Sequence, residues 1–216
     1  LLQFTTVAAF AATVVAVGGG DGPCSAHNPS FEIGPGENGE PIAGWENNGN
    51  VGRGNGLTAH GSWAAWLYGP FNGNAGISRL HITVECTAGW QHRLAVSAGH
   101  RDADALVGAA RAAFTVTWLD GTGVSLGVDS VILLNADSPV NEMIEINKLF
   151  DPAPIGTNRM RLEFVFIQTG AQETGRAYVD AFRMARVNPS VYQWGDFGST
   201  TLDFSDRVWR VKSAYT

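Results

Sequence analysis

The apolar residues of this chain recur with a period of two, and this pattern restricts the fold more than any other feature. Every second residue is apolar over residues 80–86, and the same alternation returns at 94–98 and 114–118. Side chains of a β-strand point to its two faces in turn, so this period predicts half-buried strands. Further strands are expected at residues 128–134, 143–149, 159–168 and 177–187.

Turn-forming residues separate these segments. The chain contains 27 glycines, and Asp120-Gly121-Thr122-Gly123 is a strong β-hairpin turn. Residues 103–113 are rich in alanine but interrupted by Gly108, so we interpret them as a loop or a short turn of helix. Many short strands at this spacing are typical of an antiparallel β-sandwich or jelly roll. We therefore predict an all-β domain over residues 24–187.

Length and charge narrow the classes of partner. The 216 residues accommodate one β-sandwich with flanking segments. The formal net charge is −6, and the lysines and arginines form neither the basic stripe that nucleic acid requires nor a polybasic run for anionic lipid. We expect neither nucleic acid nor a membrane surface as a partner.

The N-terminal segment, residues 1–23, has a different composition. Residues 1–17 carry no charge and have the length of the apolar part of a signal peptide, which is short for a membrane-spanning helix. Ala16 and Gly18 are the small residues that a cleavage site needs. We interpret the segment as a truncated export signal, which predicts a secreted or cell-surface protein. The alternative is a β-strand that adds to a neighbouring subunit.

The C-terminal segment, residues 188–216, also departs from the pattern of the middle. Asn188-Pro189-Ser190 is typical of a linker, and Val208-Trp209-Arg210-Val211 is typical of a strand. We interpret this segment as a linker and the truncated start of a following domain.

The chain contains two cysteines, Cys24 and Cys86, and neither belongs to a Cys-x-x-Cys motif. In a secreted protein they can form a disulfide, whereas otherwise they are buried or free thiols. Spacing alone does not decide between these alternatives.

The sequence offers little for catalysis. It has no Gly-x-Ser-x-Gly elbow, no His-Glu-x-x-His motif and no phosphate-binding loop. Glu142 and Glu145 lie three residues apart on an expected strand, without the converging partner that glycoside cleavage needs. We predict that this domain is not an enzyme.

Several short motifs, in their order along the chain, resemble those of galactose-binding-like jelly rolls, in particular carbohydrate-binding modules of the family 4, 9 and 22 type. The matching motifs are Asn28-Pro29-Ser30-Phe31-Glu32, Gly44-Trp45, His60-Gly61-Ser62-Trp63-Ala64-Ala65-Trp66-Leu67, Thr87-Ala88-Gly89, Trp118-Leu119-Asp120-Gly121-Thr122-Gly123, Pro154-Ile155-Gly156-Thr157 and Tyr178-Val179-Asp180-Ala181-Phe182. The resemblance implies binding of a polysaccharide or oligosaccharide. It also implies that Trp45 is buried.

The resemblance further implies a structural calcium ion. Its carboxylate ligands map onto Glu32 and Asp180, and backbone carbonyls near Ser62 are the further oxygen ligands that calcium requires. The family pattern often has a second acidic residue after the first, where this chain has Ala181. The alternative is that the two carboxylates cap strands or pair with arginine.

Sugar rings stack on aromatic side chains, and their hydroxyl groups bind planar polar groups. Trp118 is in phase with buried strand residues and is expected in the core, whereas Trp63 and Trp66 are expected on opposite sides of one strand. The expected ligand-binding residues are Trp63, Trp66, Trp90, Arg53, His60, Arg101, Asp102 and Gln168. Each of them can instead have a purely structural role.

The C-terminal stretch Phe204-Ser205-Asp206-Arg207-Val208-Trp209-Arg210-Val211-Lys212 resembles the first strand of family 16-type glycoside hydrolase domains. A covalently linked catalytic domain is therefore one expectation, and an ordered extension is the other. Three functions remain open at this point: a carbohydrate-binding module of a polysaccharide-degrading or cell-surface protein, a structural or adhesive sandwich, and a filament subunit.

Overall fold

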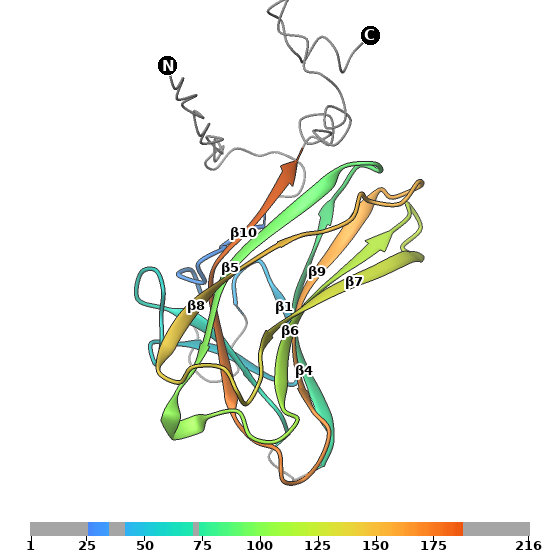
Figure 1. Cartoon of the computed structure of the whole chain (residues 1–216). Coiled ribbons are helices and arrows are strands. Elements are labelled where there is room, and N and C mark those ends of the chain that lie inside the picture. The colour runs from blue at the N-terminus through green and yellow to red at the C-terminus, as the bar shows by residue number, and fades with distance from the viewer. Residues whose placement is uncertain (1–25, 35–41, 71–73, 188–216) are drawn as a thin grey trace, which may run out of the picture.

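The computed structural model describes residues 26–34, 42–70 and 74–187, which form two five-stranded antiparallel sheets (Figure 1). The first sheet has the order β1-β4-β9-β6-β7 and the second the order β2-β3-β10-β5-β8. The strands are β1 (Glu46–Asn48), β2 (Asn50–Gly54), β3 (Ala64–Tyr68), β4 (Gly76–Glu85), β5 (Gln91–His100), β6 (Arg111–Leu119), β7 (Ser125–Leu134), β8 (Glu142–Leu149), β9 (Arg159–Gln168) and β10 (Arg176–Val187). The predicted all-β jelly-roll sandwich is confirmed.

Successive strands mostly lie in different sheets. The chain alternates between the sheets from β3 to β6 and again from β7 to β10, while β6 and β7 are joined by a hairpin within one sheet. The Asp120 carboxylate closes this hairpin by accepting hydrogen bonds from the backbone N–H groups of Thr122 and Val124. Its hydrogen bond with the Thr122 hydroxyl is the main cause that lowers the pKa of Asp120.

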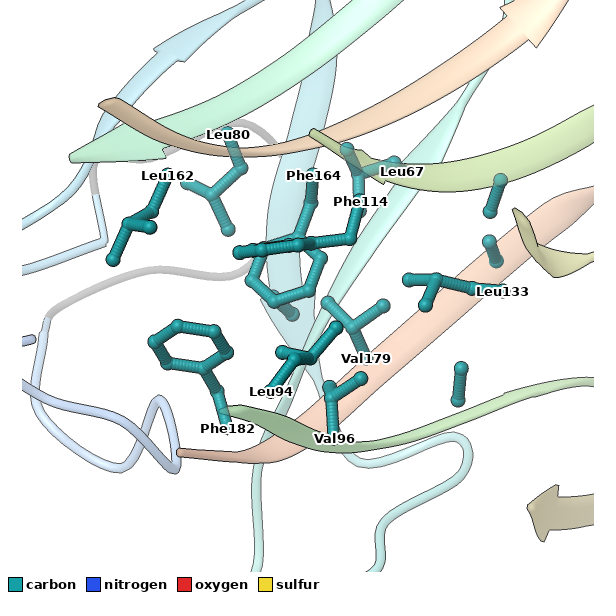
Figure 2. Close-up of a cluster of buried hydrophobic side chains, with 14 of the residues drawn as sticks. Leu67, Leu80, Leu94, Val96, Phe114, Leu133, Leu162, Phe164, Val179 and Phe182 are labelled. Atoms are coloured by element: carbon teal, nitrogen blue, oxygen red, sulfur yellow. The ribbon is translucent and has the colours of Figure 1, made fainter. Parts of the chain in front are cut away.

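The core lies between the two sheets and is rich in aromatic residues (Figure 2). Phe164 of β9 lies with its ring centroid 5.0 Å from that of Phe114 and 5.4 Å from that of Phe182. Trp45 packs on the same phenylalanine, with 5.7 Å between the ring centroids. Trp45 and Trp118 are both buried, as predicted.

Two elements differ from the sequence-based expectation. The strands β1 and β2 were not predicted, because residues 46–54 are rich in asparagine and glycine and alternate poorly. The predicted loop over residues 103–113 is too long at its C-terminal end, because β6 already begins at Arg111. The short turn of helix that was expected there is a 3-10 turn at Asp102–Asp104. Hydrogen bonding and burial in the sheet, rather than local pattern, decide these segments.

Some predictions fall on residues that the structure does not describe. Residues 1–23 and 188–216 lie outside the described part, and so does Cys24. Cys86 is buried, with its Sγ 3.7 Å from His92 Nε2, and its pairing with Cys24 stays a prediction. Within the described residues, no helix is long and apolar enough to span a membrane.

Candidate functional site

The outer face of the second sheet carries a small aromatic cluster, separate from the main core. Strand β3 places Trp66 and Tyr68 on this face because Ala65 and Leu67 between them point into the core. The two rings are stacked, with 5.0 Å between their centroids and an interplanar angle of 18°. Tyr178 of β10 is the cross-strand neighbour of Trp66 and joins the cluster.

Arg176 covers this cluster. Its guanidinium lies 5.3 Å from the ring centroid of Trp66, 5.0 Å from that of Tyr68 and 6.0 Å from that of Tyr178. Its Nη1 donates a hydrogen bond of 3.2 Å to the Tyr178 hydroxyl, and its Nε lies 3.4 Å from Asp104 Oδ2. These cation–π and polar contacts hold the guanidinium in one orientation.

Two adjoining pockets meet at Arg176. The first, the loop pocket, has a volume of about 380 Å³ and is lined by Tyr68, Asp104, Gln168, Glu173 and neighbouring loop residues. The second, the arginine pocket, has a volume of about 190 Å³ and is lined by Arg53, Arg101, Arg176, Trp66, Tyr178 and residues 54–56. Ligand sites commonly measure about 300–1,000 Å³, so the two pockets together have the size of a site for one or two sugar rings.

A buried histidine positions the loop beside these pockets. His100 has no exposed surface; its Nδ1 accepts a hydrogen bond from the N–H of Leu106, and its Nε2 lies 2.8 Å from the carbonyl oxygen of Ser138. Because Nδ1 accepts, Nε2 must be the protonated nitrogen and donates to Ser138. This link fixes the segment that carries Arg101 and Asp104.

Four of the predicted ligand-binding residues line the pockets: Arg53, Trp66, Arg101 and Gln168. Trp66 is only 3 % exposed, because Arg176 lies over it and Gly54 packs against it, so its ring offers no open face for stacking. The amide of Gln168 donates to the carbonyl groups of Asn74 and Gly170, which gives it a structural role in the wall.

The other four predicted residues are not lining residues of either pocket. Trp90 lies at the opposite end of the ten-residue strand β5, about 30 Å away along the strand, with Arg186 4.1 Å over its ring. Trp63 precedes β3 and is half-buried under Arg53, 4.3 Å from its ring centroid. Asp102 and His60 are exposed and belong to neighbouring loops.

The two predicted calcium ligands bind the same loop. Asp180 Oδ2 accepts hydrogen bonds from the N–H groups of Ala59 and His60 at 2.7 and 2.8 Å. Glu32 Oε1 accepts hydrogen bonds of 3.0 and 2.9 Å from the next N–H groups in that loop, those of residues 62 and 63. Burial raises the pKa of the Asp180 carboxyl, its backbone hydrogen bonds oppose this rise, and the charge of Glu32 adds to it.

Sequence reasoning missed Tyr68, Tyr178, Arg176 and Asp104. The alternation in β3 was a usable signal for Tyr68, because it lies two residues after Trp66 on the same face. No local signal identifies Arg176 or Asp104, which lie 72 residues apart and meet only through the packing of β10 against the loop after β5.

The two glutamates that the sequence analysis considered for catalysis do not lie at the pockets. Glu142 and Glu145 lie on β8, where both are exposed and Glu145 accepts a hydrogen bond of 3.1 Å from Asn147. No group of three or more histidine, cysteine, aspartate or glutamate side chains in the described part could hold a metal ion.

Comparisons with known proteins define the class of fold. No protein-family model and no curated protein matches the sequence. Among solved structures, the enzymatically active domain of tailspike protein 4 from bacteriophage CBA120 is 19 % identical, with a TM-score of 0.53 over 74 % of this chain and 21 % of that chain. The arabinose-bound GH51 α-L-arabinofuranosidase MgGH51 is 14 % identical, with a TM-score of 0.52 over 74 % of this chain and 26 % of that chain.

The carbohydrate-binding module TmCBM61, solved with β-1,4-galactotriose, is 17 % identical, with a TM-score of 0.48 over 74 % of this chain and 96 % of that chain. The structural neighbours include carbohydrate-binding modules, and at these identities the likeness is one of fold alone. The chain spans about a fifth of the tailspike chain and about a quarter of the arabinofuranosidase chain.

Proposed function

We propose that this domain binds a polysaccharide or oligosaccharide without cleaving it, through the two pockets that meet at Arg176. The observation that carries the proposal is the combination of a half-buried aromatic ring with a carboxylate at the same place. Tyr68 and Asp104 both line the loop pocket, and Asp104 Oδ1 has no hydrogen-bond partner among the described residues. A carboxylate in a pocket wall is an acceptor for the hydroxyl groups of a bound sugar.

The solved neighbours add support at the level of the fold. One is an enzyme bound to arabinose, and another is a binding module with a galactose trisaccharide. Because one fold hosts many functions, the pockets rather than the likeness must carry the argument.

The second candidate is a structural or adhesive sandwich without a sugar site. The burial of Trp66 and Tyr178, at 3 % and 1 % exposure, favours it, because neither ring offers an open face. The same binding experiment separates the two candidates.

In that experiment the full chain is titrated with soluble β-glucans, xylans, galactans and alginates, and binding is measured by isothermal titration calorimetry. We expect saturable binding of one class of glycan and a loss of about tenfold or more in affinity for Arg176→Ala, because this arginine touches both pockets. Arg186→Ala is the matched control, since it removes an arginine that also lies over a tryptophan ring, far from the pockets. Absence of binding by the folded protein would contradict the proposal.

We also propose that a calcium ion is held by Glu32 and Asp180. Among its contacts with the described loop, Glu32 uses only Oε1, so its second oxygen is left for a cation. A cation there would relieve the repulsion between the two carboxylates that is reflected in the pKa of Asp180. The ion would link the segment around Glu32, near the start of the domain, to β10, its last strand.

Calcium is expected to raise the melting temperature of chelator-treated protein by roughly 5–10 °C at a concentration about 100 times its dissociation constant. Differential scanning calorimetry with calcium and with EDTA measures this. Glu32→Gln should abolish the difference, whereas Glu142→Gln, on the exposed face of β8, should retain it. Equal melting temperatures in calcium and EDTA would refute the calcium site.

We further propose that the domain is exported and belongs to a larger polysaccharide-degrading or cell-surface protein. The apolar composition of residues 1–17 supports export. The small share of the tailspike and arabinofuranosidase chains that this chain spans supports a larger protein. Mass spectrometry of the mature, secreted protein tests both points.

A further inference from the structure

We propose that the arginine pocket recognises the carboxylate of an acidic sugar, so that the glycan bound by this domain contains uronate residues. This inference rests on the proposed function and names its class of ligand.

The arginine pocket is positively charged, in contrast to the chain as a whole. The chain as a whole is acidic, with 20 aspartates and glutamates against 14 lysines and arginines. The residues lining the arginine pocket nevertheless include Arg53, Arg101 and Arg176, and none of them is aspartate or glutamate. Three guanidinium groups around about 190 Å³ repel one another, and a bound anion relieves that repulsion.

The three arginines differ in what they already bind. Arg53 donates to the carbonyl groups of Phe31, Glu32 and Gly34, so it is committed to the protein and supplies mainly charge. Arg176 is held by the aromatic cluster and by Asp104, as described above. The Arg101 guanidinium makes no hydrogen bond or ion pair with the described residues, and it lines the pocket, so it is the arginine best placed to donate to a ligand.

The positions of Arg101 and Tyr178 converge on one small space. A Cβ atom at Gly56 would lie 2.6 Å from the Tyr178 hydroxyl oxygen and 3.2 Å from Arg101 Nη1. The Tyr178 hydroxyl in turn accepts from Arg176 Nη1, so one of the two polar groups at this point is itself bonded to a second guanidinium. A planar carboxylate matches guanidinium groups in charge and in hydrogen-bond geometry, and the neutral hydroxyl groups of a sugar do not.

The neighbouring loop pocket has the opposite character. Its lining includes Asp104 and Glu173 together with the half-buried ring of Tyr68. Such a surface suits the hydroxyl groups and apolar face of a ring rather than a second carboxylate. A glycan with a uronate residue in the arginine pocket and the adjacent sugar ring in the loop pocket matches the character of both pockets.

The test compares the affinities of the full chain for polygalacturonate, alginate and glucuronoxylan with those for the carboxyl-reduced form of each polymer. We expect at least one acidic polymer to bind about tenfold or more tightly than its reduced form, because hydrogen bonds between guanidinium and carboxylate groups are stronger than those to neutral hydroxyl groups. Arg101→Gln should abolish this preference without changing the melting temperature. Arg159→Gln removes the same charge from the other sheet and should retain the preference.

Each alternative outcome separates the inference from the proposed function. If the protein binds glycans but each reduced polymer as tightly as its acidic form, the carboxylate site is wrong while carbohydrate binding stands. If no polymer binds, both proposals fail. If dextran sulfate binds as tightly as the best uronate polymer, the protein attracts polyanions in general, and a specific carboxylate site is wrong. Retention of the preference in Arg101→Gln would also overturn it.

Discussion

Replacing Phe164 by alanine should lower the free energy of unfolding by about 3–5 kcal/mol, the largest effect of a single substitution that we expect in this domain. The side chain is 1 % exposed and lies on β9, the middle strand of its sheet. Its ring is within 6.3 Å, centroid to centroid, of four other aromatic rings, those of Phe31, Trp45, Phe114 and Phe182. Alanine would leave a cavity that strands of both sheets cannot close.

Urea denaturation followed by tryptophan fluorescence measures this loss. Ile155→Ala is the control, because Ile155 is 95 % exposed and its truncation should change the free energy of unfolding by less than about 0.5 kcal/mol. A loss of less than about 1 kcal/mol for Phe164→Ala would mean that the two sheets are not packed around this ring.

The second large effect is expected at Asp180. Its carboxylate has no exposed surface and accepts backbone hydrogen bonds from residues 59, 60 and 181. Asp180→Ala would leave these donors without acceptors and release residues 59 and 60 of the loop, at a cost of about 3 kcal/mol. Asp180→Asn keeps one carbonyl acceptor and should lose less, which makes it the matched control. Equal stability of Asp180→Ala and the unchanged protein in EDTA would contradict this role.

The pH dependence of stability has a defined sign at this residue. Burial raises the pKa of Asp180 above the value of 3.8 that it has when unperturbed. Between these two values the folded protein holds a proton that the unfolded chain has released, so the free energy of unfolding decreases as pH rises. Compared with Asp180→Asn in EDTA, the unchanged protein should lose stability as pH rises through this window. Chemical denaturation at a series of pH values measures the difference, and the opposite slope would refute it.

The candidate site shows how far sequence reasoning extends. The motif Trp63-Ala64-Ala65-Trp66 directed attention to β3, and Arg101 was identified from its place after β5. The expected exposed tryptophan was not found at Trp66, because Arg176 from another strand covers its ring. The partner that decides the exposure of Trp66 lies 110 residues away in the sequence.

A bulge in β10 marks a second limit. The strand pairing shifts between Asp180 and Arg183, where Ala181 has the left-handed backbone angle φ of 49°. Val179 points into the core before the bulge, and Phe182 does so after it, so the alternation changes phase at Ala181. A pattern with a fixed period of two cannot anticipate this change.

The sequence by itself determined the all-β fold class, most of the long strands and the β6–β7 hairpin, because alternation and turn residues act between near neighbours along the chain. Only the tertiary structure decided the strand order, the burial of Trp66 and the meeting of Arg101, Arg176 and Tyr178. Those features depend on the register of β3, β10 and β5, in which Tyr178 pairs with Trp66 on one side and Gly99 on the other. Register is set by packing between residues far apart in the chain, and no local pattern encodes it.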